Sequence, residues 1–250
     1  MAEVSIITPC YNSSKYIEET INSVMNQTFD DWEWIITDDQ STDNSVELIK
    51  NHNDSRIHLI IAQQNSGAGH ARNLALQKAQ GRYITFLDAD DFWEPNFIAE
   101  MVNFMKKENA EIAYSNYARC NEQLDPVLED FKADKEVTFN NLLKTCRLSL
   151  LSSMYDSQRV GKEFFPENSK REDHVMWLNL LKKISVGKPL PKTMAKYRMR
   201  ENSISRNKKN IIKDQYLVYR DFMGFSGIKS LYYTANWAFN GFLKYSKIFN

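Results

Sequence analysis

The chain has 250 residues, enough for one or two domains, and its 42% hydrophobic and 26% charged residues are ordinary for a globular protein. This composition excludes a disordered or fibrous chain, while three widely spaced cysteines argue against a disulfide framework or zinc site and favour a cytoplasmic protein. Zero net charge conceals an asymmetry, because residues 1–181 hold 17 Lys and Arg against 29 Asp and Glu, and residues 182–250 hold 15 against 3.

Short β-rich runs alternate with amphipathic segments in the first half of the chain. Strands are predicted over residues 4–7, 32–37, 57–62 and 83–87. Helices are predicted from Ser13 and Ser14, taken as N-caps, to Met25, over residues 44–50 and 69–80, the last with Gly81 as C-terminal cap, and after Pro95. This alternation predicts an α/β fold with a mostly parallel sheet flanked by helices, whose ligands bind beyond the carboxyl ends of the strands.

The pattern weakens after a further run at residues 112–117. Residues 121–135 are polar and predict a long loop. Helices are predicted over residues 139–150 and 173–183, and an edge strand over residues 194–199.

An acidic cluster, Asp88, Asp90 and Asp91, closes the apolar run 83–87. Three ionised carboxylates so close together repel one another, and they are tolerable in water or around a neutralising cation. Strand alternation would point Asp88 and Asp90 the same way, toward one hard divalent ion. A solvated turn is the alternative interpretation.

Polar loops follow the other three strands. Asp39 is suited to accept hydrogen bonds from a base edge and Tyr11 to stack on the base, although Tyr11 could equally pack on the sheet. Asp38 fits turn chemistry as well as binding, and Asp43 fits a helix cap. Residues 65–73 place small side chains at a helix N-terminus, which attracts phosphate.

Two further motifs each carry two interpretations. Arg72 could reach a diphosphate or form a salt bridge to the acidic cluster. Glu172 and Asp173 open a helix, where they could serve as N-cap and dipole partner, or where Asp173 could be a general base. His174 is a rival base.

Together these segments resemble the family 2 inverting glycosyltransferases of GT-A fold over most of residues 3–205. The resemblance rests on residues 5–12, 39–43, 65–67 with 71–73, 88–91, and 172–173 with Trp177, in the expected order. It implies a UDP-sugar donor with Mn²⁺ or Mg²⁺ on its diphosphate. It also divides the chain into a nucleotide-sugar-binding α/β half (1–112), an acceptor-binding and catalytic-base half (113–205) and a basic, aromatic helical tail (206–250).

The resemblance also implies roles for individual residues. Asp173 would be the catalytic base, and Asp90, with Asp88, would bind the metal. Donor contacts would come from Thr8, Pro9, Tyr11, Asp39, Asn65, Gly67, Arg72, Asp88, Ala89 and Arg200. Acceptor contacts would come from Glu172, Trp177 and Trp93.

The sequence departs from the family pattern at two positions. Arg200 stands where many members have a histidine, and a guanidinium cannot ligate a metal. We therefore expect Arg200, if it reaches the site, to bind the diphosphate. Gln40 stands where glycine is commoner, which affects the conformation of its loop.

The tail is aromatic and, from residue 222 on, basic without acids. Asn236, Asn240 and Lys244 interrupt it too often for a bilayer span, so it predicts a helix in the headgroup region or one docked on the body or on a second subunit, as in a homodimer. No nucleic-acid partner is expected. The implied function is transfer of a sugar to a glycan or lipid-linked acceptor in bacterial surface polysaccharide (lipopolysaccharide, capsule or exopolysaccharide) synthesis. The alternatives are a sugar nucleotidyltransferase or a non-catalytic sugar-nucleotide- or membrane-binding protein.

Overall fold

The computed structural model describes residues 2–133, 135–145, 147–200 and 210–246. Its strands are β1 (Val4–Cys10), β2 (Trp32–Asp38), β3 (Ile57–Ile61), β4 (Tyr83–Phe86), β5 (Phe92–Trp93), β6 (Ile112–Cys120), β7 (Pro126–Phe131), β8 (Ser153–Asp156) and β9 (Lys188–Arg198). Its helices are α1 (Ile17–Met25), α2 (Ser45–Asn51), α3 (Ala68–Lys78), α4 (Phe97–Glu108), α5 (Phe139–Leu142), the 3-10 turn η1 (Leu150–Ser152), α6 (Ser157–Val160), α7 (Glu172–Leu181), α8 (Ile211–Leu217), the π-helical segment η3 (Val218–Phe222) and α9 (Gly227–Ser246).

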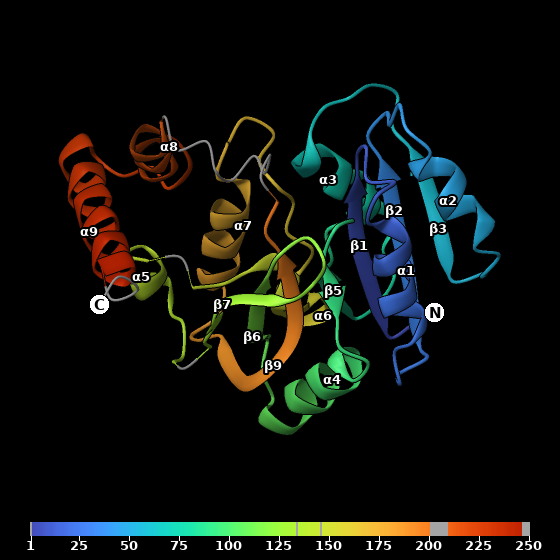
Figure 1. Cartoon of the computed structure of the whole chain (residues 1–250). Coiled ribbons are helices and arrows are strands. Elements are labelled where there is room, and N and C mark those ends of the chain that lie inside the picture. The colour runs from blue at the N-terminus through green and yellow to red at the C-terminus, as the bar shows by residue number, and fades with distance from the viewer. Residues whose placement is uncertain (1, 134, 146, 201–209, 247–250) are drawn as a thin grey trace.

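These strands form one sheet in the order β3-β2-β1-β4-β8-β6-β9-β5, with β7 paired to β6. The first four are parallel neighbours, as expected, whereas β8 is antiparallel to both β4 and β6. The sheet as a whole is therefore mixed, and its parallel half is the N-terminal one at the right of Figure 1.

Helices cover both faces of the sheet, and successive side chains along a strand point to opposite faces. Ile6 and Trp34 belong to the core packed against α1 and α4, while their neighbours Ile7 and Ile35 belong to the core packed against α3 and α7. Strands buried on both sides need continuous apolar runs, which is how they stand in the sequence.

Several predicted boundaries need correction. The expected edge strand is the longer β9, an interior strand between β6 and β5. The predicted loop 121–135 contains β7, and the helix expected over 139–150 ends at Leu142. Ser13 and Ser14 do not cap α1, whose N-cap is Tyr16 without a side-chain bond. The boundary expected near residue 205 lies outside the described residues.

The C-terminal helices lie beside α5 and α7, at the end of the molecule remote from β3 (Figure 1). Among the described residues, no helix is long and apolar enough to cross a bilayer.

Gly81 is not the cap of α3, which ends at Lys78 with Ala79 as its C-cap. Its amide donates to Ser5 Oγ at 2.8 Å, and a Cβ at this position would lie 2.5 Å from the backbone nitrogen of Ser5. Because Gly81 has no side chain, the segment that precedes β4 can pack directly against the backbone of β1.

We expect Gly81→Ala to lower the free energy of unfolding by about 3 kcal/mol, because the backbone of β1 must shift. Urea denaturation measures it. Gly241→Ala is the matched control, since no atom lies within 4 Å of a Cβ there and alanine favours a helix by up to ~1 kcal/mol. Equal effects of the two substitutions would contradict the close-packing explanation.

Candidate active site

The acidic cluster lies on a turn rather than on the strand. β4 ends at Phe86, and the Asp91 amide donates to the Asp88 carbonyl at 3.1 Å, so the strand alternation expected for Asp88 and Asp90 does not apply. Asp91 is buried, which raises its pKa, and its carboxylate accepts the Arg198 amide at 2.9 Å. Asp91 thus points into the protein, and the side chains of Asp88 and Asp90 remain 39% and 16% exposed.

Burial and the neighbouring Asp88 carboxylate together raise the pKa of Asp90 to about 6, against the opposing effect of Arg200. Three carboxylates on one partly buried turn repel one another and are poorly solvated. Compensation comes from arginines on other elements.

Arg72, in the first turns of α3, joins the acidic turn to α7. Its Nη2 donates to Asp88 Oδ1 at 2.6 Å and its Nη1 to Glu172 Oε1 at 3.2 Å, with only 7% of the side chain exposed. The salt bridge considered for this residue is thereby confirmed, and contact with a diphosphate stays a prediction. Within the described part of the chain, the buried Nε of Arg72 has no hydrogen-bond partner.

Two residues of β9 and its end also reach the acidic turn. Arg200 Nε lies 2.7 Å from Asp90 Oδ2, an ion pair without directed hydrogen-bond geometry. Arg198 is almost fully buried and donates to the Asp90 carbonyl at 2.7 Å, the Glu122 carbonyl and the Glu19 carboxylate. The sequence pattern does not single out Arg198, although it lies two positions from Arg200.

The second and third loops meet at Asp39. Its carboxylate accepts the Ser66 amide at 3.0 Å and the Gly67 amide at 2.7 Å, and Asn65 donates to its carbonyl at 2.9 Å. Gly67 has φ +90°, a conformation that suits glycine. The loop carrying the small residues is therefore held against the end of β2.

The neighbouring loop residues are placed as follows. Tyr11 is 51% exposed beside this loop and does not pack into the sheet. Gln40 has φ +66°, which explains why glycine suits this position, and its amide donates to the Ala62 carbonyl. Asp43 precedes the N-cap Asn44 and accepts the amides of Ser14 and Ser45.

The first turn of α7 holds Glu172 and Asp173, and its N-cap Arg171 makes no side-chain cap bond. Burial raises the pKa of Glu172, with Arg72 opposing it. His174 is fully buried, with its ring nitrogens 3.1 Å from the Leu142 carbonyl and 3.3 Å from Gln215 Oε1. Burial lowers the pKa of His174. Because the ring is fully buried and both of its nitrogens face protein partners, an acceptor hydroxyl does not reach it, and His174 does not serve as the rival base.

Four predicted contact residues prove to be packing residues. Trp177 is fully buried against Phe86 and Tyr155, and Trp93 is fully buried with its indole N–H on the Leu151 carbonyl, so neither lines an acceptor surface. Ala89 lies in the core, and the hydroxyl of Thr8 donates to the Leu87 carbonyl while accepting from Trp34. The tryptophans contribute volume under the site.

Asp88 and Asp90 are the carboxylates available to a cation. No group of three His, Cys, Asp or Glu side chains suited to a metal occurs among the described residues. Two carboxylates nevertheless fit Mg²⁺ or Mn²⁺, since Mg²⁺ in nucleotide sites takes its remaining ligands from phosphates and water.

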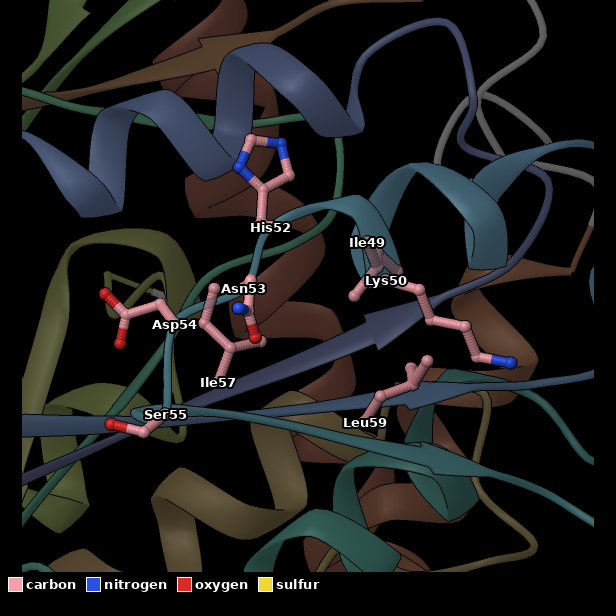
Figure 2. A pocket seen from close by; sticks show the side chains of 8 residues that line it. All are labelled: Ile49, Lys50, His52, Asn53, Asp54, Ser55, Ile57 and Leu59. Atoms are coloured by element: carbon pink, nitrogen blue, oxygen red, sulfur yellow. The ribbon is translucent and has the colours of Figure 1, made fainter.

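A separate hollow lies between the end of α2 and the start of β3 (Figure 2). It is lined by Ile49, Lys50, His52, Asn53, Asp54, Ser55, Ile57 and Leu59. Because β3 runs parallel to β2, this hollow is at the amino end of the strands, away from the acidic turn. None of the predicted site residues lines it.

Comparisons with known proteins identify the family of this chain. The family model "Glycosyl transferase family 2" matches residues 5–147, more than half of the chain. The chain belongs to glycosyltransferase family 2.

Individual relatives cover this glycosyltransferase almost completely. The putative teichuronic acid biosynthesis glycosyltransferase TuaG of Bacillus subtilis is 36% identical over 244 residues, covering 96% of this chain and 94% of the relative. WfgD of Escherichia coli, named as a UDP-Glc:α-D-GlcNAc-diphosphoundecaprenol β-1,3-glucosyltransferase, is also 36% identical, covering 97% and 95%.

Solved structures confirm the GT-A fold of this family 2 enzyme. The S. aureus TarS fragment 1–349 in complex with UDP-GlcNAc superposes with a TM-score of 0.76 at 22% identity, covering 95% of this chain and 72% of that fragment. A Pyrobaculum calidifontis mannosyltransferase solved with GDP-Man and Mn²⁺ gives a TM-score of 0.67 at 18% identity, covering 90% and 65%.

Replacing Arg198 tests the role of the buried arginine. We expect Arg198→Met to lower the free energy of unfolding by about 2–4 kcal/mol, because the Asp90 and Glu122 carbonyls and the Glu19 carboxylate lose their donor. Lys196→Met on the same strand is the control, since its ion pair to Glu94 at 3.3 Å is a partly exposed one worth under ~1 kcal/mol. Chemical denaturation of both variants measures the difference, and equal losses would contradict the buried role.

Proposed function

We propose that this enzyme transfers a sugar from a UDP-sugar, with inversion, to a hydroxyl of a glycan or lipid-linked acceptor in bacterial surface polysaccharide synthesis. The observation that carries the proposal is the Arg72 bridge between Asp88 and Glu172, which brings the acidic turn and the first turn of α7 to one site. The donor and acceptor classes are supported by the names of WfgD and TuaG and by the UDP-GlcNAc complex of TarS.

The proposed donor site runs along the carboxyl ends of β1, β2 and β4. Asp39 would accept a hydrogen bond from the uracil edge, with Pro9 and exposed Tyr11 beside the base, and Asn65 and Gly67 set the loop against Asp39. Asp88 and Asp90 would hold a divalent cation. When bound, the cation supplies neutralisation of charge on the leaving diphosphate.

The chemistry is then a single displacement. Asp173, next to Glu172 on the first turn of α7, removes the proton of the acceptor hydroxyl as that oxygen bonds to the anomeric carbon. The bond from the anomeric carbon to the diphosphate oxygen breaks on the opposite face, and its electron pair leaves with UDP. Glu172, fixed by Arg72, would border the acceptor.

A screen of UDP-sugars with Mn²⁺ for UDP release tests this function. The Asp173→Asn variant should lose about 10²- to 10⁴-fold in kcat while UDP affinity stays unchanged, because only proton removal is lost. Asp221→Asn, at an exposed carboxylate of η3, is the control and should retain full kcat. Full activity in Asp173→Asn, or no turnover of any donor by the natural protein, would exclude the mechanism.

Arg200 should bind the donor diphosphate. Its guanidinium already lies against the Asp90 carboxylate. To bind the donor, Arg200 only has to exchange this carboxylate for the diphosphate. We expect Arg200→Ala to weaken UDP binding about 10-fold or more, the loss of a charge-assisted hydrogen bond, and Arg200→Lys to recover part of it. Calorimetric titration with UDP and Mn²⁺ measures the affinity, with Lys192→Ala, an exposed pair to Glu100, as control. Unchanged affinity in Arg200→Ala would refute this role.

A further inference from the structure

The outward side of α9 carries a continuous apolar surface. Large side chains there are strongly exposed: Ile228 is 87% exposed, Leu231 64%, Phe239 62% and Phe242 70%. We call this surface the outer face of α9, made of Ile228, Leu231, Tyr232, Ala235, Phe239 and Phe242. At about 100° per residue these six positions fall within an arc of roughly 100°.

The opposite side of α9 is docked on the body. Ser230 and Thr234 are buried there, and Tyr233 packs against Tyr219 and Phe225 with ring centroids 5.7 and 5.5 Å apart. Asn240 donates to the Lys144 carbonyl at 3.2 Å. The docked side of α9 thus combines small polar residues with Tyr233, while the large side chains of the outer face point away from the body.

Charge identifies what covers this face. From residue 222 to residue 250 the sequence has three lysines, at 229, 244 and 247, and no Asp or Glu. Lys229 is exposed at the edge of the outer face, with its ammonium 3.9 Å from the Phe225 ring. A helix with aromatic residues on one face and lysines without acids is suited to the headgroup region of an anionic bilayer.

A second copy of the chain fits the face less well. Pairing two outer faces would bring two acid-free, lysine-bearing helices together, and like charges at an interface oppose association. We propose that the outer face of α9 binds an anionic membrane surface, with its apolar side chains at the acyl boundary and Lys229 among the headgroups.

The attachment of α9 also sets where the membrane lies relative to the catalytic base. α9 packs on η3, the Tyr219 hydroxyl of η3 donates to the Leu143 carbonyl at 2.5 Å, and Gln215 of α8 contacts His174, the residue after Asp173. Under the proposed function, on which this step rests, a membrane held by α9 lies on the α7 side of the site, where a lipid-linked acceptor would enter.

Vesicle flotation of the full chain tests the proposal. We expect binding to vesicles with about 30% phosphatidylglycerol, weaker binding to pure phosphatidylcholine, and a decrease with added salt. Leu231→Ser/Phe239→Ser should lower the partition coefficient at least ~10-fold, because two apolar side chains no longer enter the acyl boundary.

The matched control is Val127→Ser/Leu128→Ser, which removes two exposed apolar residues from β7 and should leave vesicle binding unchanged. Titration with UDP and Mn²⁺ should give the same affinity for both double variants, so that a failure of donor binding is separated from a failure at the membrane. Absence of binding to anionic vesicles, or equal losses in both double variants, would overturn the proposal. The proposal would also fail if the protein did not bind vesicles and formed a dimer in light scattering that Leu231→Ser/Phe239→Ser dissociates and Val127→Ser/Leu128→Ser does not.

Discussion

The structure of the site depends on charge compensation between carboxylates that would otherwise repel. Asp88, Asp90 and Glu172 converge where water is partly excluded, and burial raises the pKa of Asp90 and of Glu172. Arg72 offsets this repulsion from within the protein, because its buried guanidinium binds Asp88 on one side and Glu172 on the other. Without a cation at this point, the first turn of α7 and the turn after β4 would be driven apart.

The arginines also prepare the site for a charged ligand. Arg198 fixes the backbone of the acidic turn through the Asp90 carbonyl and the Asp91 carboxylate, so the turn keeps its shape when side chains exchange partners. Arg72 and Arg200 are paired with the carboxylates of Asp88 and Asp90. When a divalent cation and a diphosphate bind, the cation can take over the carboxylates and the diphosphate can take over the arginines, so each charged group keeps a partner of opposite charge. Groups placed in advance in this way need little reorganisation during reaction.

Sequence predicted the parts of this arrangement that follow local rules. The strands up to β4 and the polar loops after them follow from apolar runs and breaks, so Asp39, Asp88 and Asp90 were placed near one another. Depth was not predictable, because a motif does not say which side of an element faces the core. Trp177 and Trp93 are therefore packing residues, and buried Arg198 was overlooked beside Arg200.

The C-terminal helices are attached to the helix that carries the proposed base, on the side away from the donor. His174 follows the proposed base directly, and its buried ring contacts both the Leu142 carbonyl and Gln215. Burial lowers its pKa, which disfavours a second charge beside Asp173. The contact with Gln215 ties α8, and through η3 also α9, to the first turn of α7. A fully buried histidine with both ring nitrogens in contact with protein groups therefore has a positioning role rather than a role in proton transfer. The surface that α9 presents is held in a fixed relation to the carboxylate that would receive the acceptor proton.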